Sequence, residues 1–241
     1  MTHRLVLASH NAGKLEELQA LFDTGGLGVQ LLSPPGLSLV EPDEPFCTFI
    51  ENALHKARLA CAATGLPALA DDSGLSVDAL MGAPGVRSST YAGALDPLTG
   101  EDREALRRRQ DAANTACLLR ALDERQAALG SLSEPSPDGG RPSPARPARR
   151  ARFVCTLVAL RSAQDPEPLV AQGRWDGEIL RASRGQGGFG YDPVLWIPEA
   201  QATVAELGRE AKNRMSHRAR AALLMRQQMC QVWAWPQMPS G

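Results

Sequence analysis

Residues 68–85, ALADDSGLSVDALMGAPG, decide the fold class of this chain. The apolar start of this stretch predicts the end of a buried strand, and the strand stops on two adjacent carboxylates, Asp71 and Asp72. In an open α/β sheet, ligands bind in the crevice beyond the carboxyl ends of the strands. Because adjacent strand residues face opposite ways, one carboxylate can face a ligand while the other ties down a turn at Ser73 and Gly74. From this stretch alone, a plain Asx-type turn explains the same residues equally well.

The composition is that of a folded chain whose small net charge produces no strong overall electric field. The 241 residues are 43% hydrophobic and 22% charged, with a formal net charge of -1, which suits one domain or two small ones. This charge argues against nucleic acid or an anionic membrane as a partner. Five scattered cysteines are typical of reduced thiols, and the first residues do not resemble a signal peptide. No segment approaches the roughly 20 apolar residues of a membrane span, so we expect a cytoplasmic protein.

The N-terminal pattern predicts a strand, a polar loop and a helix. Residues 5–8 are an apolar run, typical of a strand covered on both faces, and leucines at helical spacing follow Lys14. The amides and the lysine of the intervening loop can point at an anion. A Walker A loop is excluded, because Ala8 stands at its first glycine position and Leu15 follows the lysine. An ordinary βα loop remains the alternative.

The middle of the chain predicts two helices and an insertion. A helix from about residue 46 to 63 leads directly into the strand with Asp72, and it carries Asn52 and Lys56 off its apolar stripe. A solvated face is the default interpretation of these two residues. A polar helical region follows from about residue 96 to 129. Residues 131–150 are rich in Pro, Ser, Gly and Arg and too poor in apolar residues to pack, which predicts a mobile loop.

A glycine-rich stretch, GQGGFGYDP at residues 185–193, follows two predicted antiparallel strands at 153–160 and 169–175. It satisfies G-x-G-x-x-G literally, but a dinucleotide fingerprint must open a helix. Here the apolar run at residues 194–197 predicts a strand instead, so a Rossmann site is excluded. What remains is a loop with one aromatic ring, Phe189, and one acid, Asp192, which suits stacking on a base and gripping its edge.

The C-terminal third predicts a basic helix start. Thr203 and Glu206 fit a capping box, and Ser216 can cap the last helix. His217 and Arg218 would then lie in its first turn, where two donors can contact carbonyl or phosphate oxygens. A basic helix end on the surface explains this pattern equally well.

Five stretches, in order from residue 5 to about residue 225, together resemble the inosine triphosphate pyrophosphatase family of non-canonical purine nucleoside triphosphate diphosphatases. They are LASHNAGKLEEL, FIENALHKA, ADDSGLSVDALMGAPGVRSSTYAG, GGFGYDP and KNRMSHR. The resemblance implies an α/β fold with an elongated mixed central sheet, flanking helices in two lobes and a cleft between them. It also implies a homodimer, and a single domain over residues 1–225 with a C-terminal tail at 226–241.

The implied reaction is Mg²⁺-dependent cleavage of ITP, dITP or XTP to the monophosphate and pyrophosphate, which cleanses the nucleotide pool. Asp72 matches the family's proton acceptor and metal ligand, and Lys56 matches a lysine near the phosphates. Asp43 falls where the family usually has a metal-binding Glu, and Glu44 beside it can take that role, since Asp is shorter. The residues that match substrate contacts are Ser9, His10, Asn11, Ala12, Gly13, Lys14, Ser73, Phe189, Gly190, Tyr191, Asp192, Lys212, His217 and Arg218. The insertion at 131–150 is longer than we expect in this family.

Three alternatives are weighed against this interpretation. Asp72-Ser73-Gly74 matches the D-[ST]-G motif of aspartic proteases, but the chain has a single copy and would need a homodimer to form the dyad. A non-catalytic nucleotide- or RNA-binding protein would use Phe189 and the arginine-rich insertion without turnover. A Mg²⁺-dependent pyrophosphatase with another base preference is the nearest alternative, and substrate profiling separates it.

Overall fold

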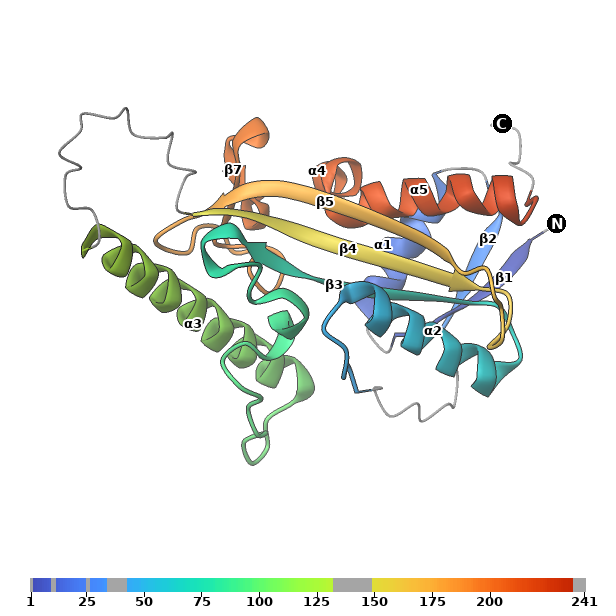
Figure 1. The fold of residues 1–241 in the computed structure, drawn as a ribbon, viewed down its shortest axis with the longest axis horizontal. Helices are drawn as coiled ribbons and strands as arrows, with labels where there is room; N and C mark the ends of the chain where they lie inside the picture. Colours follow the sequence, from blue (N-terminus) through green and yellow to red (C-terminus); the bar gives the residue numbers. More distant parts are fainter. Residues whose placement is uncertain (1, 10–11, 25–26, 34–42, 132–148, 236–241) are drawn as a thin grey trace. The chain divides into compact units, whose positions relative to one another are not determined.

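A computed structural model describes residues 2–9, 12–24, 27–33, 43–131 and 149–235. Seven strands form one sheet in the order β2-β1-β3-β4-β5-β6-β7, with helices packed against it (Figure 1). β1 pairs in parallel with β2 and β3, whereas β6 pairs antiparallel with β5 and β7. The predicted α/β class with a mixed central sheet and flanking helices is therefore confirmed.

The strands are β1 (His3–Leu7), β2 (Val29–Leu32), β3 (Ala68–Val77), β4 (Arg150–Leu160), β5 (Leu169–Ile179), β6 (Leu195–Ile197) and β7 (Ala202–Thr203). The α-helices are α1 (Ala12–Asp23), α2 (Phe49–Thr64), α3 (Arg103–Ser131), α4 (Arg209–Met215) and α5 (His217–Val232). Four short 3₁₀ turns lie at Asp78–Leu80, Gly85–Thr90, Pro198–Ala200 and Val204–Glu206.

The chain divides into two compact units. The first contains Met1–Ser73, Val154–Trp175 and Arg209–Gly241, and the second contains Gly74–Phe153 and Asp176–Gly208. Strands β3, β4 and β5 each contribute residues to both units. The division therefore cuts the central strands rather than a linker, and each unit is described by itself below.

Strand β1 separates two apolar cores in the first unit. Leu5 and Leu7 pack on one face with residues of α1 and α5, among them Met225. Val6 packs on the other face with α2, where Ala53 and Ala57 lie. All three β1 side chains are buried, because helices cover the strand on both sides. The predicted doubly covered strand is confirmed.

Strand β3 is longer than the sequence pattern predicted. The predicted strand stopped at Asp72 and turned at Ser73 and Gly74, but β3 runs on through these residues to Val77. The predicted turn is wrong. Both carboxylates find side-chain partners in neighbouring helices, as described below, so they do not need the backbone donors of an Asx turn. Tertiary contacts thus override the low strand propensity of Asp and Gly.

Capping residues stand at both ends of α2 and at the start of α5. Thr48 precedes α2 and accepts a hydrogen bond from the Glu51 N–H, and Gly65 ends the helix with a left-handed φ of +66°. Ser216 caps α5 by accepting from the Ala219 N–H, as predicted. The capping box at Thr203 and Glu206 is also present, although it starts a short 3₁₀ turn.

Four further expectations concern features other than the sheet. The helix α5 continues to Val232 and buries Met229, so residues 226–232 extend the fold instead of forming a tail. Most of the insertion, residues 132–148, lies outside the described residues. All five cysteines, each in a described range, are free thiols. Among the described helices, none combines the length and apolar character needed to cross a bilayer.

Candidate active site

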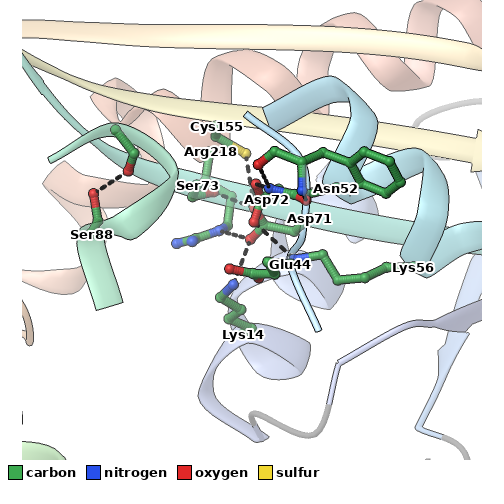
Figure 2. A network of polar contacts seen from close by, with 12 residues as sticks. Lys14, Glu44, Asn52, Lys56, Asp71, Asp72, Ser73, Ser88, Cys155 and Arg218 are labelled. Atoms are coloured by element: carbon green, nitrogen blue, oxygen red, sulfur yellow. Dashed lines mark hydrogen bonds and ion pairs between the residues drawn. The ribbon is translucent and has the colours of Figure 1, made fainter. Parts of the chain in front are cut away.

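Asp72 is held on one face of β3 by residues from α2. Its Oδ1 accepts a hydrogen bond from Lys56 Nζ at 2.8 Å, and its Oδ2 contacts Asn52 Nδ2 at 3.4 Å (Figure 2). Strand alternation explains this placement, because Ala68 and Ala70 point into the core that α2 covers and Asp72 follows in the same register. Lys56 and Asn52 lie one helical turn apart on α2, so both reach the same carboxylate.

Lys56 binds a second carboxylate as well. Its Nζ donates to Glu44 Oε1 at 2.7 Å, and the lysine is 7% exposed. Burial alone would lower the pKa of Lys56, but Asp72 and Glu44 outweigh it and raise that pKa. Burial raises the pKa of Asp72 to about 6, against the opposing effect of Lys56 and with a further rise from Glu44. One buried ammonium therefore holds two carboxylates together.

Asp71 faces the opposite side of β3, toward α1 and α5. Arg218 Nε donates to its Oδ2 at 3.0 Å, and Lys14 Nζ lies 3.5 Å from the same oxygen. The Ser73 hydroxyl donates to Oδ1, which Cys155 Sγ also contacts at 3.6 Å. Asp71 thus has a structural role, because it connects β3 to α1 and α5, whereas Asp72 lies on the face of β3 that α2 covers.

The charges around Asp71 decide its ionisation. Burial alone would raise the pKa of Asp71, but Lys14 and Arg218 hold it far below its usual range. Arg218 is 3% exposed and also donates to Glu17 Oε2 at 2.8 Å. The buried guanidinium is therefore paired with one carboxylate from β3 and one from α1. This arrangement joins α1, β3 and α5 in one ionic network.

The Glu44 and Asp72 carboxylates are oxygen ligands of the type found at Mg²⁺ sites. This ion prefers one or two carboxylates together with substrate phosphates and water. Because Glu44 Oε1 and Asp72 Oδ1 both contact Lys56 Nζ, the two oxygens can be no further apart than these two contacts added together. Asp43 is exposed, and it is the neighbouring Glu44 that reaches the cluster. The geometry therefore favours Glu44 over Asp43 as the partner of Asp72.

The loop predicted to bind a base lies in the second unit. Phe189 is 43% exposed and Arg107 Cζ lies 4.8 Å from the centroid of its ring. Tyr191 is buried and its hydroxyl donates to the Ser88 carbonyl oxygen at 3.0 Å. Asp192 is also buried, and its Oδ2 accepts from the Phe189 N–H at 3.1 Å. Of these residues, Phe189 presents its side chain to solvent, while Tyr191 and Asp192 shape the loop.

The start of α5 is fixed against β5 by a close backbone approach. A Cβ built on Gly173 would lie 2.0 Å from the His217 carbonyl oxygen and 2.6 Å from the Ala221 nitrogen. Only glycine permits this contact. Burial lowers the pKa of His217 well below its ordinary value, so its ring is neutral at physiological pH. Lys212 is half-buried in the last turn of α4.

The structure brings five of the predicted site residues together in the first unit. Lys14, Lys56, Asp72, Ser73 and Arg218 belong to the two connected groups around Asp71 and Asp72 (Figure 2). Ser9 precedes α1, whose first residues are Ala12 and Gly13. His10 and Asn11 lie outside the described residues.

Sequence reasoning did not assign the roles of three residues that hold this site. They are Asn52 beside Asp72, Glu17 beside Arg218, and Asp71 as the centre of the ionic network. The Asn52–Lys56 spacing on one helix was an available signal for the first. Nothing local marks Glu17, because its partner is 201 residues away along the chain.

A family model described as the Ham1 family matches residues 5–132 and 142–228. The chain belongs to the Ham1 family. The resemblance found in the sequence is thereby confirmed, and the residues left unmatched, 133–141, fall within the predicted insertion. Membership sets aside the aspartic-protease alternative, whose D-[ST]-G sequence lies here inside the continuous strand β3.

Relatives and solved structures agree with this family over nearly the whole chain. A dITP/XTP pyrophosphatase of Leptothrix cholodnii is 57% identical over 95% of this chain and 98% of its own. One of Pseudomonas syringae pv. tomato is 47% identical over 94% and 96%. The structure of a HAM1 protein from Coxiella burnetii is 36% identical, with a TM-score of 0.76 over 96% of this chain and 100% of that one. The Staphylococcus aureus Ham1 protein is 31% identical, with a TM-score of 0.67 over 93% and 96%.

Proposed function

We propose that this Ham1 family chain hydrolyses dITP, XTP and ITP between the α- and β-phosphates, releasing the nucleoside monophosphate and pyrophosphate with Mg²⁺. The observation that carries the proposal is the buried Lys56 ammonium held between the Glu44 and Asp72 carboxylates. The names of the relatives, dITP/XTP pyrophosphatases at up to 57% identity, support the substrate class.

Each group of the cluster has a role in this reaction. Asp72 and Glu44 would hold Mg²⁺, which when bound neutralises phosphate charge and lowers the pKa of water. Asp72 orients a water molecule and accepts its proton. Lys14 and Lys56 contribute positive charge that stabilises the charge developing on the phosphates. Asp71 does not react; it keeps Lys14 and Arg218 in place.

The resemblance implies two separate sets of nucleotide contacts, the Phe189 loop in the second unit and the start of α5 in the first. The Phe189 ring offers a stacking surface for a purine. Hypoxanthine and xanthine carry an acceptor at O6, where adenine carries a donor, so a hydrogen-bond donor discriminates between them. The neutral His217 ring has one N–H to donate, and Arg218 is a second source of donors. We assign these two residues to O6.

We also propose that the chain acts as a cytoplasmic homodimer, as the family resemblance implies. The five free thiols suit a reducing compartment. Size-exclusion chromatography with light scattering tests the oligomeric state, and a mass equal to that of one chain would contradict the dimer.

The decisive experiment measures pyrophosphate release from dITP, ITP, XTP, GTP and ATP, with Mg²⁺ and with a chelator. We expect release from the first three, little from GTP and ATP, and none after chelation until Mg²⁺ is restored. Release of orthophosphate would place the cut at another bond and overturn the reaction. Binding of dITP and XTP without turnover would favour the non-catalytic binding protein instead.

A further inference from the structure

Helix α3 holds the Phe189 loop through two contacts that lie one helical turn apart. The Arg107 guanidinium lies over the Phe189 ring, 4.8 Å from its centroid. Asp111 Oδ2 accepts a hydrogen bond from the Gly190 N–H at 2.8 Å. Residues four apart share one face of a helix. Arg107 and Asp111 therefore contact two consecutive loop residues, Phe189 and Gly190, from the same face of α3.

The same face of α3 continues at Asn114, three residues further on. Asn114 is 1% exposed, and its Nδ2 donates to the carbonyl oxygens of Ser88 and Ser89 at 3.3 and 2.9 Å. The Ser88 carbonyl oxygen also accepts the Tyr191 hydroxyl. We call Arg107, Asp111 and Asn114 the α3 stripe. Its three members contact the loop directly or the segment on which the loop rests.

The loop itself needs this external support. Gly188 has a φ of +77°, and a Cβ there would lie 2.0 Å from Asp192 Oδ2. Asp192 fixes the loop from inside by accepting the Phe189 N–H. This internal bond orders the backbone but not the Phe189 ring, which is 43% exposed. The Arg107 guanidinium lies over this exposed ring.

We propose that the α3 stripe positions the base platform and so helps to set the affinity for the purine, with Arg107 orienting the Phe189 ring and Asp111 fixing its backbone. This inference rests on the proposed function of the loop. A guanidinium that lies over the ring lowers the cost of ordering that ring when a purine binds. Both residues contact the loop proposed to bind the base, so we expect the stripe to act on binding more than on the chemical step.

The test compares two neighbouring arginines on α3. Arg107→Ala removes the cation over the ring, whereas Arg108→Ala removes an exposed side chain that pairs with Glu104 at 3.0 Å. For pyrophosphate release from ITP, we expect Arg107→Ala to raise KM about two- to fivefold, the effect of an exposed cation–π contact, with kcat changed by less than about twofold. Arg108→Ala should match the wild type, and Arg107→Lys should restore part of the lost affinity.

Asp111 gives a second, independent variant. Asp111→Ala should raise KM roughly tenfold, because it removes a charge-assisted hydrogen bond to the loop backbone. Glu104→Ala, an exposed acidic residue on the same helix, is its control. Thermal unfolding of all variants separates a positional effect from a loss of fold.

A double mutant decides whether Arg107 acts through the ring. Phe189→Ala should itself raise KM by about five- to 150-fold, because base stacking is lost. Adding Arg107→Ala to Phe189→Ala should then change nothing, because the ring that the guanidinium orients is gone. Additive effects of the two changes would overturn the role of Arg107.

The possible failures are distinguishable. If the wild type releases no pyrophosphate from dITP, ITP or XTP, the proposed function is overturned. If the wild type is active but Arg107→Ala behaves like Arg108→Ala, the function stands and the α3 stripe is rejected. A lower KM in Arg107→Ala would also overturn the inference, because the guanidinium would then compete with the base.

Discussion

Asp71 and Asp72 are adjacent in strand β3, yet their carboxylates bind different helices on opposite faces of the sheet. Asp71 Oδ2 lies 3.0 Å from Arg218 Nε of α5, and Asp72 Oδ1 lies 2.8 Å from Lys56 Nζ of α2. A single peptide unit therefore separates a structural carboxylate from a candidate catalytic one. The two residues should respond differently to substitution, and this difference can be measured.

Asp72→Asn should abolish activity and leave the fold intact. The amide keeps the size of the side chain and an acceptor for Lys56, but it cannot take a proton and binds Mg²⁺ poorly. We expect the rate of pyrophosphate release to fall by about 10²–10⁴-fold, the range for loss of a general base. Circular dichroism should show an unchanged fold. Normal turnover in a folded Asp72→Asn protein would contradict the catalytic role assigned to Asp72.

Arg218→Ala should destabilise the first unit strongly. It leaves the buried Asp71 carboxylate with Lys14, at 3.5 Å, as its nearest remaining cation. Breaking a buried ion pair by removing one partner costs about 3–5 kcal/mol, and Lys14 should keep the loss near the lower value. Urea unfolding measures it against Arg220→Ala, an exposed arginine on the same helix. Equal unfolding free energies for both variants would show that the ionic network does not stabilise the fold.

Gly173→Ala should separate β5 from the start of α5. The new methyl group would meet the His217 carbonyl oxygen at 2.0 Å and the Ala221 nitrogen at 2.6 Å, both backbone atoms. Overpacking of this kind costs about 1–3 kcal/mol, so the melting temperature should fall. Gly208→Ala is the matched control, because nothing lies within 4 Å of its added Cβ. A melting temperature like that of the control would contradict this packing.

Replacing Asp165 should lower the free energy of unfolding by an amount that depends on pH. Its carboxylate accepts from the Arg161 guanidinium at 2.8 Å and from two backbone N–H groups, and these bonds, the Arg161 guanidinium first, lower its pKa well below 3.8. A lowered pKa stabilises the fold above the unfolded value and loses that contribution as the pH falls toward the folded value. Asp165→Asn should therefore cost about 1–2 kcal/mol at pH 7 and less at pH 3. Urea unfolding at both pH values measures the gap, and a gap that widens in acid would contradict the ion pair.

Local patterns predicted most of the first unit. The apolar run of β1, the stripe of α2 and the Ser216 cap of α5 each depend on residues a few positions apart, and periodicity records such distances. The end of β3 was predicted wrongly because the same residues, Asp71 to Gly74, favour a turn when they are alone. Lys56 and Arg218 changed that preference from positions far along the chain.

At the candidate site, too, residues within local motifs were predicted, whereas residues whose partners are distant in the sequence were not. Asp72, Lys56 and Phe189 were predicted because family motifs surround them. The role of Asp71 was left open between ligand and turn, since its partner Arg218 lies 147 residues away. Asp111 carries no motif at all, and its partner Gly190 lies 79 residues away. Contacts between polar residues that are far apart in the chain produce no periodic pattern in a single sequence, so they cannot be predicted from it.

The α3 stripe also limits where this chain can change its length. One inserted residue between Arg107 and Asn114 would rotate one end of the helix by about 100° relative to the other, and the two ends could no longer face the same loop. Residues added after the last turn of α3 do not rotate the members of the α3 stripe relative to one another. The residues outside the family match, 133–141, lie beyond that turn. The unmatched residues thus follow α3 in the sequence, where added length leaves the relative orientation of Arg107, Asp111 and Asn114 on the helix unchanged.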